Sequence, residues 1–286
     1  MTVEPDRAVA VAVADQQPSR WAGLARTGAG FTAWWRLELS AAVMFRLQLM
    51  LGLFGWVVPL AFMALWNTAA EQTDGTVMTA GQTTTYYLSL LVTSNLAVMF
   101  PIIFGFGERI YSGELSVLLL QPLHPFFALM ARPLASGLFR FAPLVVVLPL
   151  LAVGLGASST AGPGDWAAGV GLWLLGWGGA TVLAACWSLV VLWFQRWGGV
   201  VGLLSGVAWV LGGLIAPSPY MPAGLRWAMR CSPFWYDQGG PAEILAGVTA
   251  PQWWMWLAAA GWLVGGLALY RRVWRVALRR YEGVGI

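Results

Sequence analysis

The side chains that most often carry catalysis or bind metals are scarce in this sequence. His124 is the only histidine, and the two cysteines, Cys186 and Cys231, are far apart. A zinc site normally needs three or four such ligands, so we expect no metal site of that kind. A Ser-His-Asp triad would have to use His124, and no G-x-S-x-G motif is present. We therefore expect no catalytic residues in this chain.

The basic residues exclude a nucleotide site of the common type. All 16 of them are arginine, whereas a P-loop requires the lysine of G-x-x-x-x-G-K-[ST]. We expect no cofactor in this chain and no ATP site built on a Walker motif.

The elements that must position any functional residue are apolar helices. The composition is 59% hydrophobic and only 10% charged, where soluble domains carry about 25% charged residues. Six runs approach the roughly 20 apolar residues that a spanning helix needs. They are 44–66, 84–104, a third from 129 or 133 to 155, 166–194, 198–216 and 253–270. The sequence predicts an all-α, polytopic membrane protein with six transmembrane helices.

Arginine placement predicts the orientation. If the N-terminus is inside, 14 of the 16 arginines fall on the inner side, and only Arg226 and Arg230 fall outside. Inner loops are enriched in basic residues, so we expect both termini to be cytoplasmic, in the cytoplasmic (inner) membrane. We interpret residues 1–30 as a disordered cytoplasmic tail and 31–284 as one transmembrane domain. Phe31, Trp34 and Trp35 indicate a short interfacial helix before the first span, unless that span begins early.

The second run is the most polar. Tyr87, Ser94, Asn95 and Met99 share one side at helical spacing. They either line a path for an amphipathic substrate or form hydrogen bonds between helices. Pro101 is expected to kink this helix, because proline lacks a backbone donor.

Small-residue ridges mark the fifth and sixth runs. Gly198, Gly202 and Gly206 form two G-x-x-x-G steps, and Gly261 and Gly265 form another. Such ridges allow helix backbones to approach closely. They predict either a subunit interface or moving seam, or packing within one subunit.

No aspartate or glutamate lies in any of the six runs. A buried carboxylate usually marks an ion or proton pathway, so its absence disfavours an ion-coupled carrier. Arg140 is the one ionisable residue deep in a run, and it can extend toward the inner surface.

The inner segment 107–125 combines charge with an apolar side. It places Glu108, Arg109 and Glu114 beside Leu115 and Leu118. As a helix, it could dock on a protein groove and pair with a partner's charges. The alternative is an ordinary solvated loop with a short interfacial helix.

Three motifs carry a resemblance. Gly113, Leu115, Leu119, Leu120 and Pro122 fit the pattern G-x-L-x-x-x-L-L-x-P. The other two are Ser232-Pro-Phe-Trp-Tyr with Gly240-Pro-Ala, and Arg279-Arg-Tyr-Glu-Gly near the end. In this order among six runs, they make residues 33–284 similar to the membrane subunits of ABC-2 type exporters. The family often has a basic residue where Gln121 stands.

The resemblance implies a permease subunit that has no nucleotide-binding site of its own. Two such subunits, identical or paired with a sister permease, would sit on separate ABC ATPase subunits that bind ATP and Mg. The residues implied to couple to the ATPase are Glu108, Arg109, Gly113, Glu114, Leu115, Leu118, Leu119 and Pro122. The segment 217–252, with Pro233, Phe234 and Pro241, would be an extracellular re-entrant hairpin.

The expected function is export of a lipophilic or amphipathic substrate, such as a drug, a natural product or a lipid. Membrane lipids are expected partners and nucleic acid is not. The alternatives are a secondary carrier or channel that works without ATP, and a membrane scaffold or lipid-modifying enzyme.

Overall fold

The computed structural model describes residues 32, 35, 36, 40, 53–72, 77–120, 124–193 and 198–280. All regular structure in these residues is helical, and no strand occurs among them. Within them, four helical stretches are long and apolar enough to cross a membrane: Ala80–Ile110, Pro125–Gly154, Pro163–Leu192 and Trp253–Arg279. They coincide with the second, third, fourth and sixth predicted runs, so the chain is a membrane protein with apolar helices.

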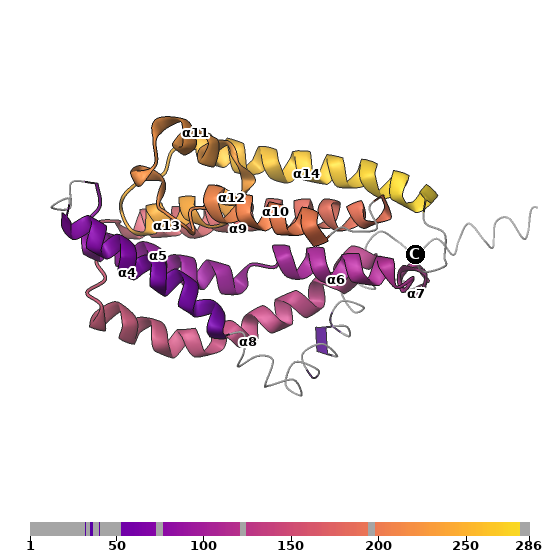
Figure 1. Cartoon of the computed structure of the whole chain (residues 1–286), viewed down its shortest axis with the longest axis horizontal. Helices are drawn as coiled ribbons and strands as arrows, with labels where there is room; N and C mark the ends of the chain where they lie inside the picture. Colours follow the sequence, from indigo (N-terminus) through magenta and orange to yellow (C-terminus); the bar gives the residue numbers. More distant parts are fainter. Residues whose placement is uncertain are drawn as a thin grey trace, which may run out of the picture.

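The helices are labelled as in Figure 1. Their order in the described residues is η1 (Leu53–Trp56), α4 (Val57–Gln72), α5 (Ala80–Leu96), α6 (Met99–Tyr111), α7 (Leu115–Leu119), α8 (Pro125–Gly154), α9 (Pro163–Ser188), η2 (Leu189–Leu192), α10 (Gly198–Leu211), η3 (Ser218–Tyr220), α11 (Ala223–Cys231), α12 (Pro233–Asp237), α13 (Gly239–Leu245) and α14 (Trp253–Arg280).

The second predicted run is divided into two helices. α5 ends at Leu96 and α6 begins at Met99, so that Pro101 lies in the first turn of α6. Proline cannot donate to the carbonyl four residues earlier, which belongs to Ala97, and it is well tolerated in a first turn. The kink predicted at Pro101 is therefore a complete interruption of the helix at Ala97 and Val98.

The first and fifth predicted runs give shorter helices. α4 has 16 residues and α10 has 14, and neither is among the four long stretches. We predicted that the fifth run continues to Ala216, but α10 ends at Leu211. The cause is a turn at Gly213, whose φ of +85° favours glycine. Residues 44–52 of the first run lie outside the described residues, and α4 continues past Trp66 to Gln72.

α9 is the central helix of the bundle. α14 lies along one side of it, and α6, α12 and α13 contact it elsewhere (Figure 1). Small residues allow this close packing: a Cβ atom on Gly179 would lie 3.4 Å from the backbone nitrogen of Leu263 in α14. α8 lies at the edge of the bundle against α5 and α6, and much of its surface faces outward.

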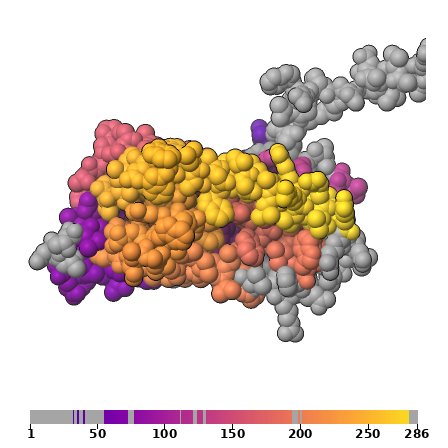
Figure 2. Space-filling model, turned by 90° about the horizontal axis from the view of Figure 1, so that it is seen from above, coloured from indigo at the N-terminus to yellow at the C-terminus, as the bar shows by residue number. Residues whose placement is uncertain are grey.

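The segment between α10 and α14 folds into the bundle. α13 lies between α5 and α9, and α12 packs directly on α9. At Gly176 of α9, a Cβ atom would lie 2.8 Å from the backbone nitrogen of Asp237, so only glycine leaves enough room. Figure 2 shows this segment in orange beside the yellow α14. We call this end of the molecule the hairpin end, and the opposite end, which carries α7, the α7 end.

The N-terminal predictions fall almost entirely outside the described residues. Thr32, Trp35, Arg36 and Ser40 are helical, and the Ser40 hydroxyl donates to the Arg36 carbonyl over 2.9 Å. Phe31, Trp34 and the predicted tail of residues 1–30 lie outside, so the interfacial helix and the tail stay predictions.

Candidate functional site

The segment predicted to couple to an ATPase forms a sharp turn at the α7 end. α6 ends at Tyr111, and the N–H of Gly113 donates to the Ile110 carbonyl over 3.2 Å. The φ of Gly113 is +80°, a left-handed conformation that costs other residues about 1–2 kcal/mol. Gly113 therefore sets the angle at which α7 leaves α6.

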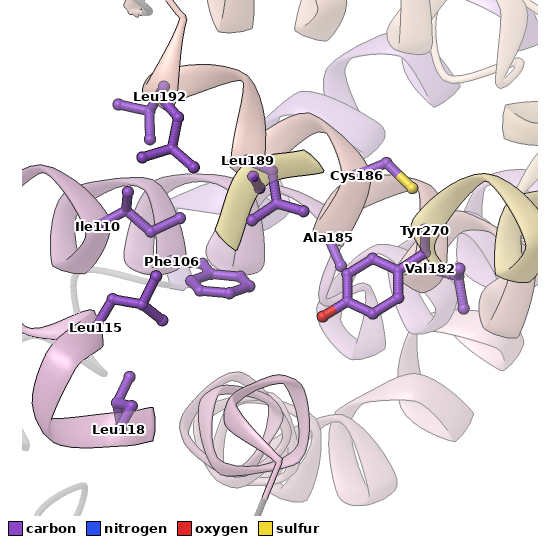
Figure 3. Packing of buried hydrophobic residues seen from close by; sticks show 12 residues of the cluster. Phe106, Ile110, Leu115, Leu118, Val182, Ala185, Cys186, Leu189, Leu192 and Tyr270 are labelled. Carbon is purple, nitrogen blue, oxygen red and sulfur yellow. The ribbon is translucent and has the colours of Figure 1, made fainter. Parts of the chain in front are cut away.

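Two leucines attach α7 to the rest of the chain. Leu115 and Leu118 are only 1% and 4% exposed. They join a buried cluster with Phe106, Ile110 and Leu189 (Figure 3). We predicted these leucines as an apolar side for a partner's groove, but their side chains are buried in their own chain. In a coupling site, they would position α7 rather than touch the partner.

The charged residues of the segment remain accessible. The Arg109 Nε lies 3.8 Å from the Glu114 Oε2, and the Glu114 side chain is 61% exposed. Such exposed pairs contribute only about 0–1 kcal/mol, so a competing partner charge can replace this one at little cost. Glu108 is also exposed.

Apolar side chains on the outer side of α7 are exposed as well. Val117, Leu119 and Leu120 are 60%, 40% and 88% exposed. Sequence reasoning assigned Leu119 to the coupling site but did not single out Val117. The helical spacing could have separated the two sides, because Leu115 and Leu118 differ by three positions, as do Val117 and Leu120. Pro122 lies outside the described residues.

Three of the four predicted path residues are buried, and two of them, Tyr87 and Met99, pack within apolar clusters of their own chain. Tyr87 is fully buried and donates its hydroxyl to the Ile215 carbonyl over 3.3 Å. Met99 is 5% exposed and packs in the core around α6. These two residues therefore face internal packing surfaces in this conformation.

The other two lie near the interruption between α5 and α6. Asn95 accepts a hydrogen bond from Trp56 Nε1 (3.2 Å) and donates to the Leu91 carbonyl (2.7 Å). The Ser94 hydroxyl donates to the same carbonyl over 3.2 Å. Asn95 thus forms a hydrogen bond between helices. The sequence offered two roles for this polar side, lining a substrate path or bonding between helices, and Asn95 has the second.

A cavity of about 500 Å³ lies between α5, α8 and α9. Its wall is mostly apolar, with Val92 from α5, Leu144 and Leu148 from α8, and Trp173 from α9 among the residues that form it. This volume lies within the range of about 300–1,000 Å³ that is typical of small-molecule sites. None of the four predicted path residues belongs to this wall. The Trp173 Nε1 is buried and has no hydrogen-bond partner among the described residues.

A cation lies where α5 is interrupted. Arg140 donates through Nη2 to the Asn95 carbonyl over 3.4 Å, and Trp177 Nε1 donates to the Leu96 carbonyl over 3.0 Å. These carbonyls are free because the last turn of a helix lacks intrahelical donors. The Arg140 Nε is buried and has no partner in the described part of the chain.

Arg140 is energetically costly at this place. An arginine at the centre of a spanning helix costs about 2.5–3.5 kcal/mol on insertion scales. We expected its side chain to extend toward the inner surface, and its guanidinium contacts the end of α5 at Asn95. As predicted, the second run itself contains no charged residue. The charge beside it is that of Arg140, which belongs to the third run. The signal in the sequence was that Arg140 is the one ionisable residue deep in an apolar run.

The predicted glycine ridges face away from the described part of the chain. For Gly198, Gly202, Gly206, Gly261 and Gly265, no described atom apart from the adjoining residues and the helix's own backbone lies within 4 Å of the position that a Cβ would take. By contrast, Gly176 and Gly179 of α9 are closely packed. Close helix packing inside the described bundle therefore uses other glycines than those we predicted.

The segment 217–252 is held together by a buried glutamate. Glu243 is 0% exposed. Its carboxylate accepts hydrogen bonds from the Ser218 N–H (3.0 Å), Trp235 Nε1 (3.3 Å) and the Thr249 hydroxyl (3.0 Å). Pro233 and Phe234 are half-buried, and Pro241 is buried in α13. The segment 217–252 therefore forms a compact element with its own polar centre.

A second buried acid in this segment has no such partners. Asp237, at the end of α12, is 4% exposed, and its Oδ1 has no hydrogen-bond partner among the described residues. Burial raises the pKa of Asp237 from 3.8 to about 7. Sequence reasoning missed both acids because they lie outside the apolar runs, in a segment that a linear hydropathy pattern treats as a loop.

The comparison with known families agrees with this architecture. The family model for ABC-2 family transporter proteins matches residues 47–285. No curated protein and no solved structure matches the chain. The matched region includes the four long apolar helices, the Gly113 turn with α7, and the hairpin segment. The chain therefore belongs to the ABC-2 family of membrane transporter proteins.

Proposed function

We propose that this chain is the permease subunit of an ATP-driven exporter in the cytoplasmic membrane. Separate ABC ATPase subunits bind ATP and Mg and contact the permease at the α7 end. The arginine distribution supports cytoplasmic placement of this end and of both termini. α4 with η1 and α10 complete a set of six spans with the four long stretches, and the N-terminal interfacial helix precedes them.

The observation that carries this proposal is the way in which α7 is presented. Its buried leucines fix it to the bundle, while Glu108, Glu114 and Leu120 are exposed around it. An ATPase that changes shape on nucleotide hydrolysis can move the spans only through an element that it contacts differently in its two states. A short helix fixed to the ends of α6 and α14 by a shared core transmits such a displacement.

At the hairpin end, the segment 217–252 acts as the re-entrant hairpin that closes the path to the outside. Its burial between α5 and α9 supports this role, because a solvated loop would not insert between two spans. The path carries a lipophilic or amphipathic substrate, for which the mostly apolar cavity supplies a suitable wall.

The permease works as a dimer, with a second copy or a sister permease. The support is the exposed face of α10, where Gly202 and Gly206 lie beside Leu203 and Val207, which are 73% and 39% exposed. A small-residue ridge with apolar neighbours is a common surface for helix association in membranes.

The test replaces Glu108, Arg109 and Glu114 together with alanine. We expect the variant to insert in the membrane normally but to lose stimulation of the partner ATPase and recovery of the complex. The control is Glu71→Ala, which removes an exposed acid near the hairpin end. Complex formation and transport that survive the triple change would refute the coupling role.

Asp237 favours one competing function, a proton-coupled carrier that acts alone. A buried carboxyl with a pKa near neutrality can exchange a proton during transport. Purified chain in liposomes with a pH gradient and without ATP distinguishes the two functions. Proton-coupled uptake that is lost in Asp237→Asn would favour the carrier.

A further inference from the structure

Arg140 is half-buried, its Nε atom is fully buried, and it lacks a counter-charge among the described residues. It lies fifteen residues after the first residue of α8 and fourteen before the last, about 20 Å from either end, too far for its side chain to reach the ends. Its one hydrogen bond to the described residues is the 3.4 Å contact with the Asn95 carbonyl. Arginine stays protonated in proteins and carries five donors, so most of its donors have no partner in the described part of the chain.

No acid of the described chain supplies the missing charge. Among these residues, the ion pair at the α7 end joins Arg109 and Glu114, and neither residue belongs to α8. Among the described elements, α5, α6 and α7 pack most extensively on α8. Their only acid apart from Glu114, which caps α7, is Glu108, which is exposed near the far end of α6. Within the described residues Arg140 therefore has no counter-ion, and an anionic ligand at this place would supply one.

The cavity between α5, α8 and α9 continues the same face of α8. Leu144 and Leu148 belong to its wall, and Arg140 lies one helical turn before Leu144, about 6 Å along the axis. Side chains on a helix lean toward its N-terminus, so the guanidinium lies beyond the cavity's end on the α7 side. On α5, the wall residues Val92 and Thr93 precede Asn95 by one turn or less.

We propose that Arg140 and this cavity form one binding site for an amphipathic anion. A carboxylate or phosphate group pairs with Arg140, and an apolar chain fills the cavity toward the hairpin end. The unpartnered Trp173 Nε1 donates to a polar atom of the same ligand. The shared chemistry is an acidic head on an alkyl chain, whether it belongs to a bilayer lipid or to a free amphiphile.

This inference rests on the proposed function in one respect: it names the class of cargo. A headgroup that crosses a bilayer is most costly halfway, and Arg140 supplies a charge at the midpoint of α8. Binding itself requires neither nucleotide nor ATPase. A binding experiment on the permease alone therefore fails or succeeds independently of the coupling role of α7.

The test measures binding of dodecyl phosphate and of dodecanol, its uncharged counterpart, to the full chain in phosphatidylcholine nanodiscs. Arg140→Gln removes the charge and Arg140→Lys keeps it, while Arg132→Gln removes an exposed arginine from the same helix. Val145→Trp adds a large ring to the wall of the cavity, to which Val145, 59% exposed, belongs. Val146→Trp adds the same ring one position along, at a residue that is 68% exposed and outside the wall.

We expect the phosphate to bind at least about tenfold more tightly than the alcohol, since bonds to a charged group are worth a factor of this order. Arg140→Gln abolishes that preference, Arg140→Lys retains part of it, and Val145→Trp weakens both ligands. Arg132→Gln and Val146→Trp leave binding unchanged. Equal binding of phosphate and alcohol, or an unchanged preference in Arg140→Gln, would overturn the proposal. If Arg140→Gln does not fold, unchanged binding in Val145→Trp overturns it instead.

Nanodiscs that contain phosphatidylglycerol distinguish the two sources of the anion. In one outcome, this lipid displaces dodecyl phosphate from the wild-type protein but does not displace the dodecyl phosphate that still binds to the Arg140→Gln variant. The site then takes bilayer headgroups. If dodecyl phosphate remains bound with its charge preference intact, the site takes a free amphiphile.

Discussion

Removing one buried leucine of α7 should detach this helix while the spans stay folded. Leu115 is 1% exposed, and Leu→Ala changes at such sites cost about 2–5 kcal/mol. A helix of five residues has almost no stability of its own. Most of this loss should therefore appear as local opening of α7, and 2 kcal/mol corresponds to about a 30-fold larger open population.

The matched control is Leu120→Ala, because Leu120 is 88% exposed and changes at exposed sites stay within about 0.5 kcal/mol. Hydrogen exchange measured by mass spectrometry reports the opening free energy of each segment. We expect exchange in the peptide 112–120 to accelerate at least about 30-fold in Leu115→Ala and to stay unchanged in Leu120→Ala. Peptides from α9 and α14 should exchange as in the wild type.

Equal exchange in the two variants would refute the reasoning, because it would mean that burial of Leu115 does not hold α7 in place. The same two variants also test function. Leu115→Ala should impair stimulation of the partner ATPase, even though the Leu115 side chain is not accessible to the partner. Leu120→Ala should impair this stimulation only by removing a contact with the partner, without faster hydrogen exchange in α7.

Two further predictions concern the hairpin end. Gly176→Ala places a methyl group against the backbone of Tyr236 and Asp237, and such overpacking costs about 1–3 kcal/mol or more. Thermal melting in detergent should show a clear loss of stability, whereas the control Gly178→Ala, with Leu263 Cδ1 at 3.5 Å, should melt as the wild type. Because the pKa of Asp237 is about 7 in the folded chain and ordinarily 3.8, the fold favours the protonated form, and stability falls as the pH rises from about 4 to above 7. The loss approaches 4 kcal/mol in the wild type and should be absent in Asp237→Asn; a variant with the same pH dependence would contradict this assignment.

The long spans were predictable because each is a local pattern. An apolar run of about 20 residues specifies a spanning helix without knowledge of its neighbours. Four of the six runs match long helical stretches, of which the second is divided between α5 and α6. The interruption at Ala97 also has a local cause in Pro101. The end of α10 at Leu211 was harder to predict, since the residues up to Ala216 remain apolar and only the φ of Gly213 ends the helix.

The candidate site depends on contacts between distant residues, which a linear pattern does not contain. Ser218 and Glu243 are 25 positions apart, and Tyr86 donates to the Gly213 carbonyl over 2.7 Å across 127 positions. Leu115 and Leu118 are predictably apolar, but whether they face a partner or their own chain depends on the position of α9 and α14. Arg140 is similarly visible in the sequence, whereas its contact with Asn95 is a property of the packed bundle.

The central claim is that this chain transports only when a separate ATPase drives it. Reconstitution of the permease with its ATPase in liposomes, with export of an amphipathic anion measured against time, tests this claim most directly. Transport should require ATP and should stop when the ATPase is omitted or when its catalytic residue is replaced. Transport at the full rate by the permease alone would contradict the account.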